Sequence, residues 1–257
     1  MRLFYALVII LLSCVAARAE EWKELKGEHF IIYYAEDDKF ASEVLRQAER
    51  YYEKIASDLG YSRYDNFWQW DNRARVYIYR DQGDFLRATG KPQWIHGTAI
   101  YDRKEIISYR WGRNFLDTLL PHELAHLIFR DFVGFKSRIP LWLDEGVSQW
   151  EEASKRRPAG IFVRELIRKG DYIPLSELMR VGRMSENDAA LSAKLYAQAV
   201  TLVGYLIESC GSAKFTLFCR QLRDGKTVDE ALSSVYTDFI PDTGALEKKW
   251  LNHYGGN

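Results

Sequence analysis

Two periodicities of apolar residues divide the chain into a strand-containing first part and a helical second part. Stretches of aromatic and β-branched residues, in places alternating with polar ones, predict strands over residues 28–34, 73–80, 97–101 and 105–109. Apolar positions at helical spacing predict helices over residues 38–59 and 82–89, each followed by a glycine. The segment 102–104 is the expected turn of a hairpin between the last two strands.

In the second part of the chain, the apolar residues recur only at helical spacing. The predicted helices of this second part cover residues 141–154, 161–167, 175–179, 192–208, 214–222, 227–235 and 244–250. The expected fold class is α+β. We expect a mixed-sheet lobe over residues 28–132 and a helical lobe over 141–254, together forming one domain that covers 20–257.

The first nineteen residues have the pattern of a secretory signal peptide. A basic start at Arg2 precedes an apolar run that is too short to cross a bilayer comfortably, and Ala17-Arg18-Ala19 offers a cleavage site. The resulting expectation is a secreted or periplasmic protein with no transmembrane segment in the mature chain. Two alternatives stay open: a lipid anchor on Cys14, because Leu11-Leu12-Ser13-Cys14 resembles a lipoprotein box, and an uncleaved membrane anchor.

Composition and charge exclude some classes of protein. Hydrophobic residues make up 47% of the chain and charged residues 28%, which suits a folded domain and not a disordered or fibrous one. The formal net charge is zero, so no electrostatic feature favours nucleic acid as a partner. Cys210 and Cys219 remain after cleavage at Ala19, and either a small disulfide or two buried thiols would suit them.

The candidate chemistry lies in His122-Glu123-Leu124-Ala125-His126. On a helix, His122 and His126 are about one turn apart, so both imidazoles leave the same face and can bind one metal ion. Glu123 is offset from them, which suits a general base for a metal-activated water. Asp117 or Thr118 is expected to cap this helix, with Pro121 in its first turn and Gly134 at its end.

Eighteen residues after His126 stands Glu145, within Trp142-Leu143-Asp144-Glu145-Gly146. This spacing and segment resemble the gluzincin metallopeptidases, in particular peptidase MA-like relatives of aminopeptidase N and thermolysin. The resemblance implies a thermolysin-like zincin fold, with Zn²⁺ bound by His122, His126 and Glu145. Three protein ligands leave a fourth position for water, as catalytic zinc requires.

The resemblance also suggests where a substrate and a further catalytic group lie. An edge strand at residues 97–101 would pair with an extended protein or peptide substrate. That stretch lacks the amine-binding Glu of the aminopeptidases, which favours an endopeptidase. Tyr196, in a segment similar to one of this family, would stabilise the oxyanion. Where thermolysin has an Asp that orients a His ligand, this chain has Gln149, so Asp144, Ser148 or a backbone carbonyl is expected to replace it.

These features lead to one main hypothesis and one alternative. The main hypothesis is an exported zinc metallopeptidase that hydrolyses peptide bonds with Glu123 as general base. The alternative is an envelope scaffold or substrate-binding protein that keeps the fold and the zinc without catalysis. A structural zinc is disfavoured, because Glu123 would have no purpose beside an ion whose ligands are complete.

Overall fold

The structure is a computed structural model that describes residues 22–60, 68–134, 139–182, 188–237 and 239–256. The predicted signal sequence and the alternative anchor at Cys14 lie outside the described residues. The strands are β1 (Lys23–Lys26), β2 (Phe30–Tyr34), β3 (Ala74–Tyr79), β4 (Gly97–Ile100) and β5 (Glu105–Tyr109). The helices are α1 (Asp38–Asp58), α2 (Gln82–Thr89), α3 (Leu120–Val133), α4 (Leu141–Glu151), α5 (Ala153–Lys169), α6 (Leu175–Leu178), α7 (Ala189–Cys210), α8 (Ser212–Arg223), α9 (Val228–Tyr236) and α10 (Thr243–Gly255).

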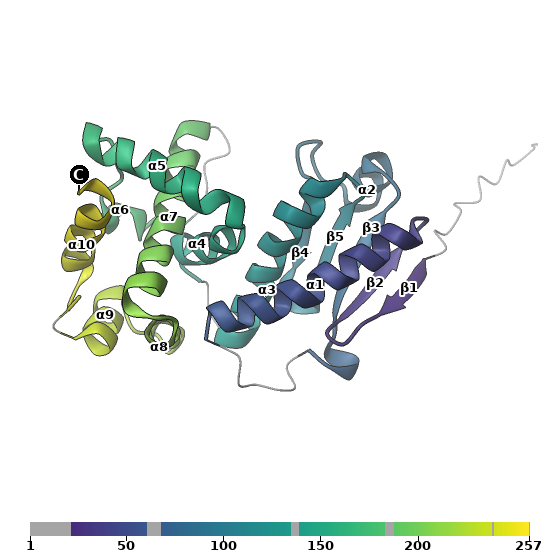
Figure 1. Cartoon of the computed structure of the whole chain (residues 1–257), viewed down its shortest axis with the longest axis horizontal. Helices are drawn as coiled ribbons and strands as arrows, with labels where there is room; N and C mark the ends of the chain where they lie inside the picture. The colour runs from purple at the N-terminus through teal and green to yellow at the C-terminus, as the bar shows by residue number, and fades with distance from the viewer. Residues whose placement is uncertain (1–21, 61–67, 135–138, 183–187, 238, 257) are drawn as a thin grey trace, which may run out of the picture.

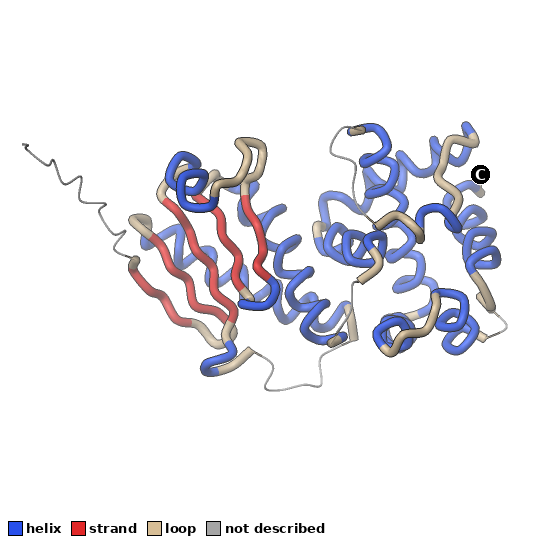
Figure 2. The backbone as a smooth tube through the Cα atoms, turned by 180° about the vertical axis from the view of Figure 1, so that it is seen from behind, coloured by secondary structure: helices blue, strands red, loops and turns tan. Residues whose placement is uncertain are grey.

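The five strands form one mixed sheet in the order β1-β2-β3-β5-β4 (Figure 2). The pairs β2–β3 and β3–β5 are parallel, and the two outer pairs are antiparallel. The hairpin between β4 and β5 is confirmed: the 3₁₀ turn η2 (Tyr101–Arg103) joins them, and Lys104 takes a left-handed conformation with φ 52°. Strand β1 was not predicted, because its sequence Lys-Glu-Leu-Lys is mostly charged.

Helices α1 and α3 cover one face of this sheet (Figure 2). The side chains of β2 and β3 alternate, so that Phe30, Ile32, Val76 and Ile78 are buried beneath the helices. From there α3 also contacts α4, the first helix of the second part (Figure 1). The chain is thus a mixed α/β protein whose sheet comes from the first part of the sequence, in agreement with the predicted α+β class.

Helix α7 is the centre of the helical part, where it packs against α4, α5, α8 and α10. Among the described residues it alone is long and apolar enough to cross a membrane, but 61% of its most apolar window is buried inside the protein. Close packing explains this burial. A Cβ on Gly146 of α4 would lie 2.7 Å from the Ala199 carbonyl oxygen of α7, and one on Gly204 of α7 would lie 2.4 Å from the Trp150 ring of α4.

Two contacts fix α1 against the helical part. The Nζ atom of Lys54 lies 2.7 Å from Oε2 of Glu151, whose side chain is fully buried at the end of α4. The Thr216 hydroxyl of α8 donates to the carbonyl of Leu59, the residue that ends α1. These contacts hold α1, and with it the sheet that α1 covers, against α4 and α8.

Both cysteines of the second part are free thiols. Cys219 is buried in the core, and burial raises the pKa of its thiol well above the ordinary value. Of the two alternatives left open by the sequence, the structure shows the reduced pair.

Candidate metal centre

The helix that carries the His-Glu-x-x-His motif begins differently from the prediction. Residues Phe115–Leu119 form a π-helical turn, η3, that runs directly into α3 without a side-chain cap, so the predicted cap by Asp117 or Thr118 is wrong. No cap is needed because the preceding turn supplies acceptors, as when the Leu120 N–H donates to the Phe115 carbonyl. The end of α3 is as predicted: Gly134 has φ 70° and its N–H donates to the Arg130 carbonyl.

The three candidate ligands converge on one point. The Nε2 atoms of His122 and His126 lie 3.2 Å apart, and each lies 3.9 Å from a different carboxylate oxygen of Glu145. The candidate ligand atoms all lie within 4.8 Å of one another. Glu145 arrives from α4, whose first N–H groups bond to the carbonyl of Pro140. Gly146 lets α4 pack closely against α7. This packing positions the neighbouring residue, Glu145, so that its carboxylate faces the two imidazoles.

The chemistry and spacing of these donors fit zinc. Two imidazoles and one carboxylate are a catalytic zinc set, and bonds of ~2 Å at tetrahedral angles put the donor atoms roughly 3.3 Å apart. His126 is nearly buried, whereas His122 and Glu145 keep 22% and 16% of their side-chain surface exposed. The site is therefore open on one side, so that a further ligand can reach an ion held there.

A carboxylate holds each imidazole from behind. Nδ1 of His126 lies 3.0 Å from Oδ1 of Asp144, and Nδ1 of His122 lies 2.8 Å from Oε1 of Glu152. If each Nδ1–H donates to its carboxylate, the tautomer that this contact favours, both Nε2 lone pairs point at the common centre. With both Nδ1 atoms held by carboxylates, the two Nε2 atoms, 3.2 Å apart, are left either to share a proton or to bind one cation between them.

Asp144 therefore orients a His ligand, the role that the sequence comparison with thermolysin would have given to an Asp at position 149, where this chain has Gln149. The Ser148 hydroxyl, another of the expected substitutes, instead donates to the backbone carbonyl of Asp144. Glu152 was not predicted. It stands seven residues after Glu145, two helical turns, and this spacing is the signal that could have identified it. The helix predicted over 141–154 in fact ends at Glu151, and Glu152 leaves helical geometry with ψ 87°.

Electrostatics reflect this crowding of charged groups. Burial would lower the pKa of His126, but the charge and hydrogen bond of Asp144 outweigh it and raise this pKa to about 9. Burial would raise the pKa of Asp144, yet His126 and the guanidinium of Arg130 hold it below its ordinary value. Burial raises the pKa of Glu145 against the opposing influence of the two imidazoles. A divalent cation would relieve the cost of keeping Glu145 ionised in this environment.

Glu123 and Tyr196 flank the centre. Glu123 is half-buried, forms no hydrogen bond or ion pair among the described residues, and its charge contributes to the raised pKa of His126. Its carboxylate is thus close to the ligands and uncommitted. Tyr196 enters from α7, where burial and the nearby charges of Glu145 and Glu152 raise its pKa to about 12. It therefore stays protonated at neutral pH and can donate a hydrogen bond.

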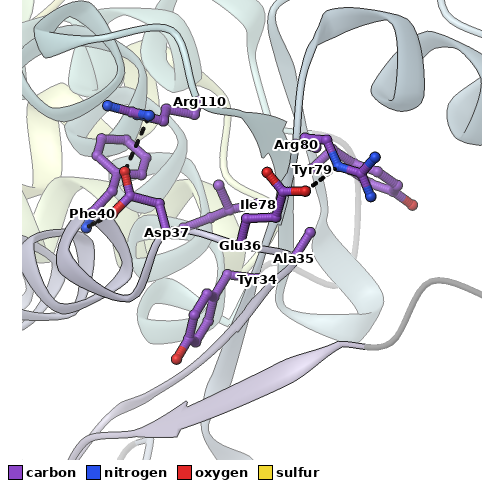
Figure 3. A pocket seen from close by; sticks show the side chains of 9 residues that line it. All are labelled: Tyr34, Ala35, Glu36, Asp37, Phe40, Ile78, Tyr79, Arg80 and Arg110. Atoms are coloured by element: carbon purple, nitrogen blue, oxygen red, sulfur yellow. Dashed lines mark hydrogen bonds and ion pairs between the residues drawn. The ribbon is translucent and has the colours of Figure 1, made fainter.

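A separate hollow of about 50 Å³ lies where β2 and β3 end and α1 begins (Figure 3). All four charged side chains that line it are engaged: Arg80 lies 2.9 Å from Glu36, and Arg110 lies 3.2 Å from Asp37. Asp37 also caps α1 by accepting from the Phe40 N–H. These contacts stabilise the start of α1 and pair the four charges of the hollow with one another, so the metal centre is the better candidate site.

A mixed α/β fold with a His-His-Glu centre and an uncommitted glutamate beside it is typical of a metallopeptidase-like protein. The sequence profile of the Peptidase MA superfamily matches residues 66–255. The chain therefore belongs to the Peptidase MA superfamily, as the motif and its spacing predicted. No curated protein matches the chain.

Proposed function

We propose that the protein is an exported zinc metallopeptidase that cleaves peptide bonds within a chain. The observation that carries this proposal is the convergence of His122, His126 and Glu145 beside an unpaired Glu123. These three ligands would hold Zn²⁺, which supplies a Lewis acid able to lower the pKa of a water to about 7. Asp144 and Glu152 fix the imidazoles in the tautomer that binding requires.

Glu123 and Tyr196 would carry the proton transfer and the charge stabilisation. Glu123 would accept the proton of the attacking water and deliver it to the leaving amine, as its position beside both imidazoles allows. The neutral Tyr196 hydroxyl would donate to the oxygen that becomes negative as the carbonyl is attacked. The two groups come from α3 and α7, so the reacting bond would lie in the cleft of a thermolysin-like zincin with two lobes.

The position of strand β4 favours a peptide as the substrate. Among the described residues it pairs only with β5, so one of its edges is free, and it is the strand nearest the helical part (Figure 1). Its first residue, Gly97, packs against Leu119 just before α3, and Tyr101 after its end lies against the ring of His126. A substrate chain added to this edge would run alongside the motif.

The carboxylates at the centre favour cleavage within a chain over removal of terminal residues. Glu145 is a candidate ligand, Asp144 and Glu152 hold the imidazoles, and Glu123 is the proposed base. None of these four is left to bind a free α-amine, which an aminopeptidase requires. Export rests on the sequence pattern of residues 1–19 alone.

The decisive experiment compares peptides released from an envelope protein extract by the zinc-loaded wild type and by Glu123→Gln. We expect products with the wild type only, while both proteins hold equal amounts of zinc. Internal cleavage sites would support the endopeptidase assignment. Equal product from Glu123→Gln, or no product from a zinc-loaded wild type, would overturn the proposal in favour of a non-catalytic zinc protein.

A further inference from the structure

Arg130 connects the metal centre to the end of the edge strand. It stands on α3 four residues after His126, so both side chains leave the same face of the helix. Its guanidinium donates to Oδ2 of Asp144, while Oδ1 of the same carboxylate lies 3.0 Å from Nδ1 of His126. Both oxygens of the buried Asp144 are therefore held, one by the ligand and one by Arg130.

Tyr101 holds the other side of this guanidinium. The guanidinium carbon of Arg130 lies 3.8 Å from the centre of the Tyr101 ring, and the same ring meets that of His126 edge to face at 6.0 Å. Tyr101 belongs to η2, directly after β4, and remains 41% exposed. Tyr101 thus connects the end of β4 to α3 and is partly accessible to solvent.

We propose that Arg130 is a positioning residue of the metal centre, held by the ring of Tyr101, so that the end of β4 is tied to His126 through Arg130 and Asp144. The proposal rests on the metal site of the proposed function. A carboxylate with one fixed oxygen can still rotate, whereas two opposed donors fix its plane and with it the direction of the imidazole. The same link would align the ligand with any chain that adds to β4.

The residue type agrees with this role. A planar guanidinium can stack on a ring and donate in its own plane at the same time, which a lysine ammonium cannot do. The Nε of Arg130 is buried without a partner among the described residues. Burying an unpaired donor is unfavourable, so the contact of Arg130 with Asp144 is not simply a surface ion pair that stabilises the fold.

The test measures zinc affinity by competition with a chromophoric chelator, using the mature full-length protein. We expect Arg130→Gln to weaken zinc binding roughly 10- to 100-fold, and Arg130→Lys, which keeps the charge but loses the planar stack, to weaken it less. Arg46→Gln is the matched control, because the exposed side chain of Arg46 pairs with Glu43 on its own helix, α1. Zinc binding by Arg130→Gln and Arg130→Lys equal to that of the control would overturn the role of Arg130.

The tyrosine is tested in the same assay. We expect Tyr101→Phe to keep the wild-type zinc affinity, since the ring remains, and Tyr101→Ala to lose affinity in the direction of Arg130→Gln. The double variant Tyr101→Ala, Arg130→Gln should then lose less than the sum of the two single changes, because both act through one contact. Additive losses, or an unchanged Tyr101→Ala, would overturn the link to β4.

Thermal unfolding of the metal-free proteins separates positioning from simple stabilisation. A positioning role predicts that metal-free Arg130→Lys, which keeps the positive charge beside Asp144, unfolds near the wild-type temperature while its zinc affinity falls. A parallel fall in both would assign Arg130 a structural role instead and overturn the proposal. Failure of the proposed function looks different. In that case the wild type itself would not bind zinc or would not cleave peptides.

Discussion

Nδ1 of His122 lies 2.8 Å from Oε1 of Glu152, a residue thirty positions later in the chain. The contact depends on the end of α4 at Glu151, because Glu152 leaves the helix and turns back toward α3. The second oxygen of Glu152 is buried without a partner among the described residues. A buried carboxylate with only one contact is costly, so the His122 imidazole is the group that stabilises Glu152 at this position.

Replacing Glu152 should therefore weaken metal binding. We expect Glu152→Ala to lower zinc affinity roughly 10- to 100-fold, and Glu152→Gln to lower it less, since its carbonyl oxygen still accepts from Nδ1. Equilibrium dialysis against zinc measures both. Glu165→Gln, at an exposed pair with Lys169, is the control. If Glu152→Ala binds zinc like this control, the contact has no role in ligation.

Glu145 and Glu123 should separate ligation from proton transfer. Glu145→Ala removes one of three donors, so we expect the protein as purified to contain much less zinc than the wild type. Glu123→Gln leaves the three donors in place and should contain as much zinc as the wild type. Metal analysis by inductively coupled plasma mass spectrometry measures this. Full zinc content in Glu145→Ala would show that Glu145 is not a ligand.

Removing the metal should destabilise the native protein. An ion that binds only the folded chain stabilises it by about 2.7 kcal/mol when its concentration is 100 times Kd. We expect a chelator to lower Tm in differential scanning fluorimetry, and added zinc to restore it. Glu145→Ala should respond far less to the chelator. An equal fall in Tm for this variant would mean that the stabilising ion binds elsewhere.

Gly146 should tolerate no larger side chain. A Cβ there would lie 2.7 Å from the Ala199 carbonyl oxygen and from a methyl of Val203, so we expect Gly146→Ala to cost about 1–3 kcal/mol and to displace Glu145. On α5, a Cβ on Gly160 meets its nearest atom at 3.6 Å, and Gly160→Ala should stabilise by about 0.4–1 kcal/mol. Urea unfolding measures both. Equal effects would contradict the close-packing argument.

Tyr196 should affect turnover and not ligation. Removing one oxyanion donor typically lowers kcat by roughly 10²–10³, and we expect Tyr196→Phe to do so with zinc affinity unchanged. Steady-state kinetics on a cleaved peptide, with zinc competition in parallel, measures the two effects. Tyr205→Phe, on the same helix, is the control. An unchanged kcat in Tyr196→Phe would remove this residue from the reaction.

Part of the ligand set could be predicted from local spacing, because one helical turn brings His122 and His126 together in any helix. Glu145 was implied by the resemblance to the gluzincins, and the groups that support the ligands depend on tertiary contacts. The roles of Glu152 and Arg130 could not be read in this way, because each depends on how α3 meets α4 or η2. The strands with aromatic and β-branched residues were predicted closely. The π-helical turn before α3 was missed, because Pro121 resembles an ordinary helix start.

The two borders of the sheet differ in their protection against unwanted association. The outer strand β1 carries Lys23, Glu24 and Lys26, and charges on a border strand discourage another copy from joining it. The opposite border, Gly97–Ile100, has no charged residue at all. If extended chains bind at β4, as proposed, that border cannot be shielded with charge. Concentrated preparations are therefore most prone to self-association along β4, and Thr98→Lys should reduce it.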